Sequence, residues 1–118
     1  MVISQGDVFW AELPRPFGRG PESRRPVVVV QNDVFNQVGI NSVVVCHTTR
    51  NLQRAHSPGN VLLAKAEANL PHRSVVNITQ ITTVRREQLA EKIGTLSHER
   101  LGEVLAGIRL LIEPAPPR

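Results

Sequence analysis

Two arginines stand directly before a proline and a run of four valines, in the order Arg24, Arg25, Pro26 and then residues 27–30. A guanidinium group is planar and always charged, and its donors match the geometry of a phosphate. Pro26 pushes the residue before it towards an extended backbone. The valine run predicts a strand that is buried on both faces or that crosses a small barrel. The pattern therefore places Arg25 at a rigid strand mouth, where we expect the chemistry.

The net charge of +4 lies entirely between Leu13 and Asn60. Basic and acidic residues cancel in the rest of the chain. The basic residues of this stretch are all arginine, the residue preferred for phosphate and base contacts. They are Arg15, Arg19, Arg24, Arg25, Arg50 and Arg54, against the acids Glu22 and Asp33. This clustering favours a polyanionic partner over the alternative, a solvated arginine-rich loop surface.

The chain of 118 residues is long enough for one domain with a real core, which we assign to residues 1–113, followed by a proline-rich tail at 114–118. No apolar run approaches the roughly 20 residues of a membrane helix. The first residues lack the basic and apolar regions of a signal peptide. Cys46 is the single cysteine; it fits a reducing cytoplasm, and its valine-rich neighbourhood predicts a small core side chain.

Short strands are predicted along most of the chain, because β-branched runs alternate with segments rich in proline, glycine and polar residues. The predicted strands are Asp7–Leu13, Pro26–Gln31, Ser42–Thr48, Val61–Leu63, Ser74–Ile78, Gln80–Arg85 and Lys92–Leu96. Long loops are expected at Pro14–Arg24 and Thr49–Gly59, and a turn or one short helical turn at Asn32–Gly39.

One C-terminal helix is well marked. Ser97 is a good N-cap and Glu99 stands in the first turn, where the helix dipole favours an acid. Leu96 and Leu101 are spaced as a hydrophobic staple, and Pro114 ends the helix. A single apolar stripe is formed by Leu101, Val104, Leu105, Ile108, Leu111 and Ile112. We assign the stripe to packing, and the order of elements predicts a mainly β fold with one helix on a small barrel.

Several kinds of site are absent from the sequence. The four histidines lack metal-ligand spacing and the single cysteine offers no zinc set. No phosphate-binding glycine loop and no nucleophile elbow occurs. Aromatic residues are too few for a stacking platform of several rings. We therefore expect neither metal nor cofactor. Arginine, threonine, serine and glutamine at strand ends remain, a set that binds a phosphodiester without a metal.

Five short motifs follow one another in a specific order: Gly6–Leu13, Arg25-Pro26 with 31–33, Thr48-Thr49, Ser74–Val76 and Gln80–Val84. This ordered set resembles the MazF/PemK toxins, the ribosome-independent endoribonucleases of bacterial toxin–antitoxin modules. The likeness runs from about Gly6 to Ile112. It implies the CcdB/MazF/PemK-type toxin fold, which is an SH3-like small barrel with a strongly twisted antiparallel sheet.

The resemblance also implies an activity and partners. The expected activity is sequence-specific, metal-independent cleavage of single-stranded RNA by the 2′-hydroxyl, which leaves 2′,3′-cyclic phosphate and 5′-hydroxyl ends and inhibits translation and growth. The expected partners are a second copy of the chain and a cognate MazE-like antitoxin with an acidic C-terminal segment. We expect a symmetric dimer with an arginine-lined groove across its interface.

Site residues carry over position by position. Arg25 matches the family's catalytic arginine, and Thr48 matches the threonine that binds the scissile phosphate. Ser74 and Gln80 match positions that line the RNA groove. The other RNA-binding candidates are Arg24, Arg19, Arg50 and Phe17, whose ring either stacks on a base or anchors its loop. Residues 18–23 of the first loop, Gly-Arg-Gly-Pro-Glu-Ser, differ from the family's common G-x-E-Q pattern, and Glu22 is the only acid there.

The general base and two rival functions stay open. His47 is adjacent to Thr48, but neighbouring residues of a strand point to opposite faces. His47 is therefore either a direct participant in the reaction or a side chain that packs or lies at the rim. A CcdB-like gyrase-inhibiting toxin shares this fold but relies on a Trp-Gly-Ile C-terminus, whereas this chain ends in 114–118, Pro-Ala-Pro-Pro-Arg. A non-catalytic nucleic-acid-binding barrel is the other alternative; the Arg25 and Thr48 pair argues against it.

Overall fold

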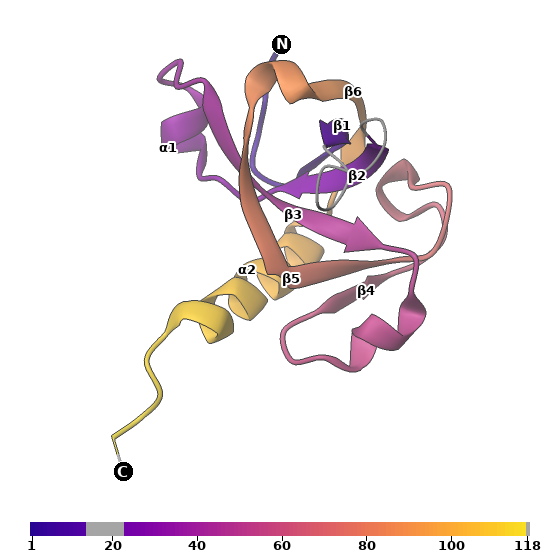
Figure 1. The fold of residues 1–118 in the computed structure, drawn as a ribbon, viewed down its shortest axis with the longest axis vertical. Helices are drawn as coiled ribbons and strands as arrows, with labels where there is room; N and C mark the ends of the chain where they lie inside the picture. Colours follow the sequence, from indigo (N-terminus) through magenta and orange to yellow (C-terminus); the bar gives the residue numbers. More distant parts are fainter. Residues whose placement is uncertain (14–22, 118) are drawn as a thin grey trace.

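The computed structural model describes residues 1–13 and 23–117, over which the chain is mainly β with one long helix (Figure 1). The elements in chain order are β1 (Asp7–Leu13), β2 (Ser23–Val29), α1 (Asp33–Asn36), β3 (Ser42–Thr49), η2 (Leu52–His56), β4 (Val61–Leu63), η3 (Glu67–Asn69), β5 (Ser74–Arg85), η4 (Arg86–Gln88), β6 (Leu89–Thr95) and α2 (His98–Ile112), where η denotes a 3₁₀ helix.

The strands form one antiparallel sheet in the order β4-β5-β3-β2-β1-β6. The sheet is strongly curled (Figure 1), and η3, which follows the edge strand β4, contacts the other edge strand, β6. Asn69 Nδ2 donates to the Ile93 carbonyl of β6 at 3.2 Å. The predicted mainly β fold with a strongly twisted antiparallel sheet is confirmed, and the sheet forms a half-barrel with β4 and β6 as its edges.

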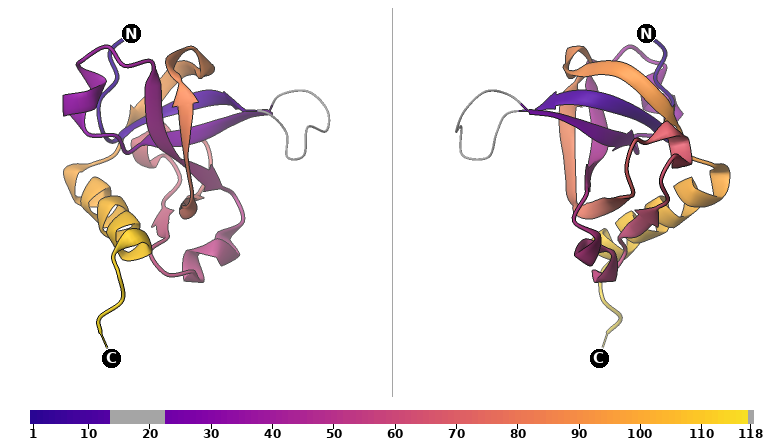
Figure 2. Two further views of the ribbon diagram at one scale, coloured as in Figure 1. Left: turned by 60° about the vertical axis from the view of Figure 1, so that its left-hand side comes forward. Right: turned by 90° about the vertical axis from the view of Figure 1, so that its right-hand side faces the viewer.

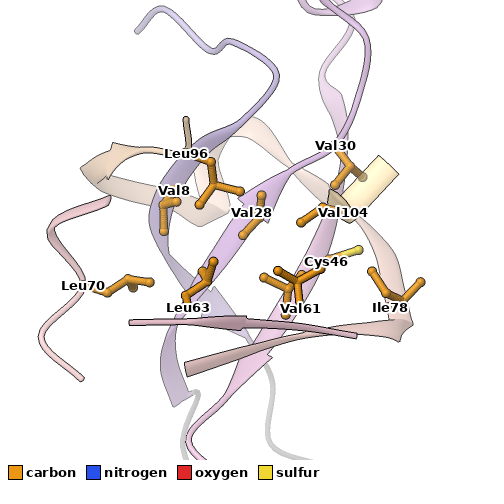
Figure 3. Packing of buried hydrophobic residues seen from close by; sticks show 11 residues of the cluster. Val8, Val28, Val30, Cys46, Val61, Leu63, Leu70, Ile78, Leu96 and Val104 are labelled. Atoms are coloured by element: carbon orange, nitrogen blue, oxygen red, sulfur yellow. The ribbon is translucent and has the colours of Figure 1, made fainter. Parts of the chain in front are cut away.

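The valine run is buried as predicted, with Val27, Val28 and Val29 at 0 % exposure. Successive side chains point to opposite faces of the sheet, so the run serves two clusters. Val28 packs with Cys46 and with Val104 of α2 (Figure 3), and its two neighbours pack in the cluster on the other face. Cys46 is a core side chain, as predicted, and burial raises the pKa of its thiol to about 12.

The predicted start of β2 at Pro26 is wrong, because the strand begins at Ser23. Arg25 lies opposite Ala11 of β1, in the interior of the strand and not at its mouth. β3 pairs only with residues 27–29 of β2, so the first half of β2 has a neighbour on one side alone. Such an edge tolerates Pro26, which has no N–H to donate. The β1 and β2 pairing extends the strand beyond what the proline signal indicates (Figure 2).

The two predicted strands at 74–78 and 80–85 are one strand with a bulge. Opposite β5, the register on β3 changes between Cys46, which faces Ile81, and His47, which faces Asn77. Residues 78–80 therefore have no opposite residue on β3. A bulge of this kind bends a strand and re-aims its side chains. The break in the sequence pattern was real, but it marks a bulge and not a strand end.

The helix α2 begins as predicted, with the Ser97 side chain accepting from the Arg100 N–H at 3.1 Å. Val104 is fully buried, but Leu111 and Ile112 are 43 % and 70 % exposed. The assignment of the whole stripe to packing is therefore wrong for the last turn, because α2 runs out beyond the sheet there (Figures 1 and 2). No described helix is long and apolar enough to span a membrane.

Candidate functional site

A cavity of about 680 Å³ lies beside the first half of β2, the end of β3 with the segment that follows it, and the start of β5 with its bulge. Six sequence-predicted site residues line it together: Arg24, Arg25, Thr48, Arg50, Ser74 and Gln80. The other described lining residues are Trp10, Ser23, Pro26, Thr49, Asn51, Arg54, Pro71, His72 and Asn77. The candidates Phe17 and Arg19, and Glu22 of the same loop, lie outside the described residues.

The cavity is strongly basic. Four of its described lining residues are arginines, and none of the described ones is an aspartate or glutamate. Fields from clustered like charges inside a concave surface add, and they attract and hold a polyanion. This arrangement suits a chain of phosphates better than a neutral or cationic ligand.

Arg24 and Arg25 have different surroundings. The Arg24 guanidinium forms an ion pair with Glu91 of β6, and its carbon lies 5.5 Å from the centre of the Trp10 ring. The Arg25 side chain is exposed, and its Nε donates a long hydrogen bond of 3.4 Å to Ser23 Oγ. Among the described residues, no carboxylate is within ion-pair distance of Arg25. Arg25 is thus the member of the pair whose charge is free to meet an anion.

Thr48 is buried, and its hydroxyl donates to the Pro26 carbonyl at 2.8 Å. That bond joins β3 to β2 at the residue next to Arg25, beyond the last paired residues of the two strands. The hydroxyl has only one hydrogen. Thr48 therefore fixes the backbone that carries Arg25, and it donates to a phosphate only by giving up this bond.

His47 lies next to these residues, although it does not line the cavity. Its Cα is opposite both Val27 of β2 and Asn77 of β5, and its side chain is half-buried. Burial and the positive charge of Arg25 lower the pKa of the His47 imidazole. The buried Nδ1 finds no hydrogen-bond partner among the described residues. A neutral His47 imidazole therefore adds no further positive charge beside Arg25 at neutral pH.

The segment after β3 is shaped by side-chain caps. Thr49 Oγ1 accepts from the Asn51 N–H at 3.1 Å, and the Asn51 side chain accepts from the Gln53 N–H at 3.2 Å to begin η2. These bonds turn the chain at the cavity and place the exposed Arg50 and Arg54 on its lining. Asparagine favours such turns because its short side chain bonds to nearby backbone.

Ser74 and the residues that sequence reasoning missed complete the lining. Ser74 is 3 % exposed and its hydroxyl donates to the His72 carbonyl at 3.0 Å, so this buried side chain supports the backbone of the cavity wall.

Three residues of the cavity lining, Trp10, Arg54 and Asn77, were not assigned to the site from the sequence. For Asn77 a signal existed, since a single amide interrupts the apolar run at 75–78. In residues 1–13 and 23–117, no cluster of three or more metal-ligand side chains occurs.

A curled antiparallel sheet with one C-terminal helix is a fold that this chain shares with solved MazF structures. The MazE-MazF (Form-II) structure from Deinococcus radiodurans matches with a TM-score of 0.78 and 21 % identity, over 98 % of this chain and 99 % of that one. An endoribonuclease in complex with its cognate antitoxin from Mycobacterial species matches with a TM-score of 0.75 and 21 % identity, over 97 % and 99 % of the two chains.

Residues 4–112 match the model of the PemK-like, MazF-like toxins of type II toxin–antitoxin systems, and the chain belongs to this family. Endoribonuclease MazF6 of Mycobacterium tuberculosis is 37 % identical over 113 residues, which are 96 % of this chain and 99 % of that protein. Endoribonuclease EndoA of Bacillus subtilis is 31 % identical over 104 residues, covering 88 % and 89 %. The family resemblance predicted from the motifs is confirmed.

Proposed function

We propose that this toxin is a sequence-specific endoribonuclease that cuts single-stranded RNA in the cytoplasm and thereby inhibits translation and growth. The observation that carries the proposal is the exposed Arg25 in a cavity lined by four arginines and by no described carboxylate. The endoribonuclease names of the relatives from Mycobacterium tuberculosis and Bacillus subtilis support it.

The proposed reaction is an internal transesterification in which solvent water takes the proton from the 2′-hydroxyl and supplies the proton to the leaving oxygen. The 2′-hydroxyl of a nucleotide attacks the neighbouring phosphorus and loses its proton, the bond to the 5′-oxygen breaks, and that oxygen takes up a proton. The products are a 2′,3′-cyclic phosphate and a 5′-hydroxyl. Negative charge concentrates on the non-bridging oxygens at the transition state. Arg25 stabilises that charge with two parallel N–H donors.

Arg25 stabilises charge and does not act as the base. A guanidinium keeps its proton at neutral pH and is therefore a poor proton acceptor. The bond from Thr48 to the Pro26 carbonyl supports a positioning role for that threonine, since it holds the strand at Arg25. His47 keeps its place beside the guanidinium as a neutral ring, outside the lining of the cavity.

A cognate antitoxin is the second partner that we propose. Solved relatives were determined as a MazE-MazF complex and as an endoribonuclease with its cognate antitoxin. The basic cavity favours an acidic, partly disordered segment of the antitoxin that orders on binding and competes with RNA. Strong salt would weaken both complexes, because both depend on the same arginines.

Assembly as a homodimer is supported by an apolar surface distinct from the cavity. Phe35 of α1 and Ile108 of α2 line a second hollow of about 380 Å³, which shares no residue with the basic cavity. The two helices lie on the same side of the molecule (Figure 2). The exposed large apolar side chains around them include Val34, Val38, Ile40, Leu110, Leu111 and Ile112. An apolar hollow with exposed apolar side chains on the two helices beside it favours a protein interface.

One experiment tests the reaction. Purified protein is incubated with end-labelled single-stranded RNA in EDTA, beside the same strand with one 2′-deoxy nucleotide just upstream of the cut. We expect cleavage of the all-ribose strand in EDTA and none of the substituted strand, because the internal nucleophile is missing. Cleavage of the deoxy strand would refute transesterification. An uncut ribose strand, together with inhibition of gyrase, would favour the CcdB-like alternative.

A further inference from the structure

The bulge in β5 brings two amide side chains together at the cavity. Residues 78–80 have no opposite residue on β3, so the bulge alters the usual alternation of side chains between Asn77 and Gln80. Both side chains line the cavity. Asn77 Nδ2 donates to Gln80 Oε1 at 3.0 Å. An amide side chain has a donor end and an acceptor end, and the direction of this bond decides which end of Gln80 faces a ligand.

The direction is set by backbone groups at the far end of the network. Asn60 Nδ2 donates to the Arg54 carbonyl at 2.9 Å, and Asn60 Oδ1 accepts from the Ile78 N–H at 2.9 Å. A backbone carbonyl only accepts and a backbone N–H only donates. The two ends of the Asn60 amide therefore have one possible assignment.

This assignment passes along the side chains. Asn60 Nδ2 also donates to Asn77 Oδ1 at 3.4 Å, and the Thr79 hydroxyl donates to the same oxygen at 3.1 Å. With its oxygen accepting both bonds, Asn77 turns its nitrogen to Gln80. Gln80 accepts through Oε1, so its Nε2 is left without a partner among the described residues and is free to meet a ligand.

We propose that Asn60 and Asn77 hold Gln80 with its amide N–H groups towards the RNA, so that one base position of the target is read by its oxo group. This inference rests on the proposed function and names the base chemistry that the cavity selects. Uracil O4 and guanine O6 are oxo acceptors at the ring positions where cytosine N4 and adenine N6 are amino donors. The bases of a single strand are splayed and expose these edges.

The expected preference is modest and measurable. A net hydrogen bond changes an equilibrium about 3- to 10-fold, so the protein should favour uracil or guanine over cytosine or adenine by about that factor at one position. Asn77 and Asn60 act as positioning residues, since only Gln80 meets the base. Their effect is on which base is chosen, more than on how fast the chosen RNA is cut.

Asn77→Asp is the decisive variant. A carboxylate has no donor, so its second oxygen requires the Nε2 of Gln80 in place of Oε1, and the Gln80 amide turns over. Its acceptor then faces the RNA, and the preference should reverse to cytosine or adenine. Gln80→Glu reaches the same reversal by removing the donors directly. Asn77→Ala releases Gln80 and should leave the four bases within about twofold of one another. Gln37→Glu, at the exposed C-cap of α1 and outside the cavity lining, is a control with the same change of charge and should keep the wild-type preference.

Two readouts separate this inference from the proposed function. The first is sequencing of the ends produced from a random RNA pool, and the second is sequencing of a 2′-O-methyl pool retained by the protein, which is not cut. Each preference is a ratio within one variant, so a general loss of affinity from the added charge cancels. Reversal with Asn77→Asp and Gln80→Glu in the retained pool supports the inference even if no RNA is cleaved. An unchanged preference in Asn77→Asp, or a wild type without any oxo-selecting position, overturns it.

Discussion

The neighbouring arginines of β2 should separate catalysis from stability. Arg25→Ala removes a donor from the phosphate, and loss of one preorganised donor costs about 2.7–4 kcal/mol of transition-state stabilisation, which is about 10²- to 10³-fold in rate. The same change breaks only a 3.4 Å contact to Ser23 on an exposed side chain. Its effect on the free energy of unfolding should be within about 0.5 kcal/mol.

Arg24→Ala should show the opposite pattern. It removes the ion pair with Glu91, an exposed pair typically contributing about 0.2–1 kcal/mol, and the contact with Trp10, about 0.5–1 kcal/mol at an exposed site. The two contacts together predict a drop in melting temperature of a few degrees, since about 1 kcal/mol corresponds to roughly 4 °C in a domain of this size. Cleavage should weaken only moderately, because Arg24 is already paired.

The assay combines single-turnover cleavage of a labelled RNA with thermal unfolding followed by circular dichroism. Arg25→Lys is a useful third variant, because it keeps the charge and loses the planar fork; it should recover binding more than cleavage. An active Arg25→Ala beside an inactive Arg24→Ala would reverse the assignment. Equal loss of activity in both, with unchanged stability, would refute the argument from their different partners.

Three further outcomes follow from the packing and the charges. Gly107→Ala should lower the free energy of unfolding by roughly 1–3 kcal/mol, because its Cβ would lie 2.2 Å from the Gly59 carbonyl oxygen. Gly102→Ala, with open space around it on the same helix, should raise that free energy by about 0.8–1 kcal/mol; urea unfolding measures both. Folding lowers the pKa of His47 from 6.5, so the folded state favours the neutral imidazole. The stability that the neutral ring contributes is fully present above pH 6.5 and is lost as the pH falls through the folded pKa. His47→Gln should flatten this part of a stability–pH curve, and an unchanged curve would exclude His47 as its source. Phe35→Asp should turn the proposed dimer into a monomer on sedimentation, and a dimer that persists would place the interface elsewhere.

Much of the fold could be predicted from local patterns. β1, β4 and the start of α2 match their predicted bounds, because alternation and a serine N-cap are read over a few neighbouring residues. The extension of β2 to Ser23 could not be predicted, since pairing with β1 decides it. The bulge in β5 depends in the same way on the register of β3, which no local pattern encodes.

For the site, residue types were easier to predict than their partners. The arginine cluster and its neighbouring threonine were visible in the sequence, and the structure brings the described members to one cavity. The ion pair of Arg24 with Glu91 joins residues far apart in the chain, so no local sequence pattern around Arg24 predicts it. Asn60 escaped notice for the same reason, as its bonds reach two other segments.

The close contact between Gly59 and Gly107 separates two functions of the segment between β3 and β4, attachment to the fold and lining of the cavity. Backbone atoms meet on both sides, and a Cβ on Gly59 would lie 3.1 Å from Gly107 Cα. The segment between β3 and β4 is thus anchored from behind by α2, while its side chains Arg50 and Arg54 stay exposed at the cavity. We expect substitutions of Arg50 and Arg54 to change the recognition of RNA while the backbone of the segment keeps its place.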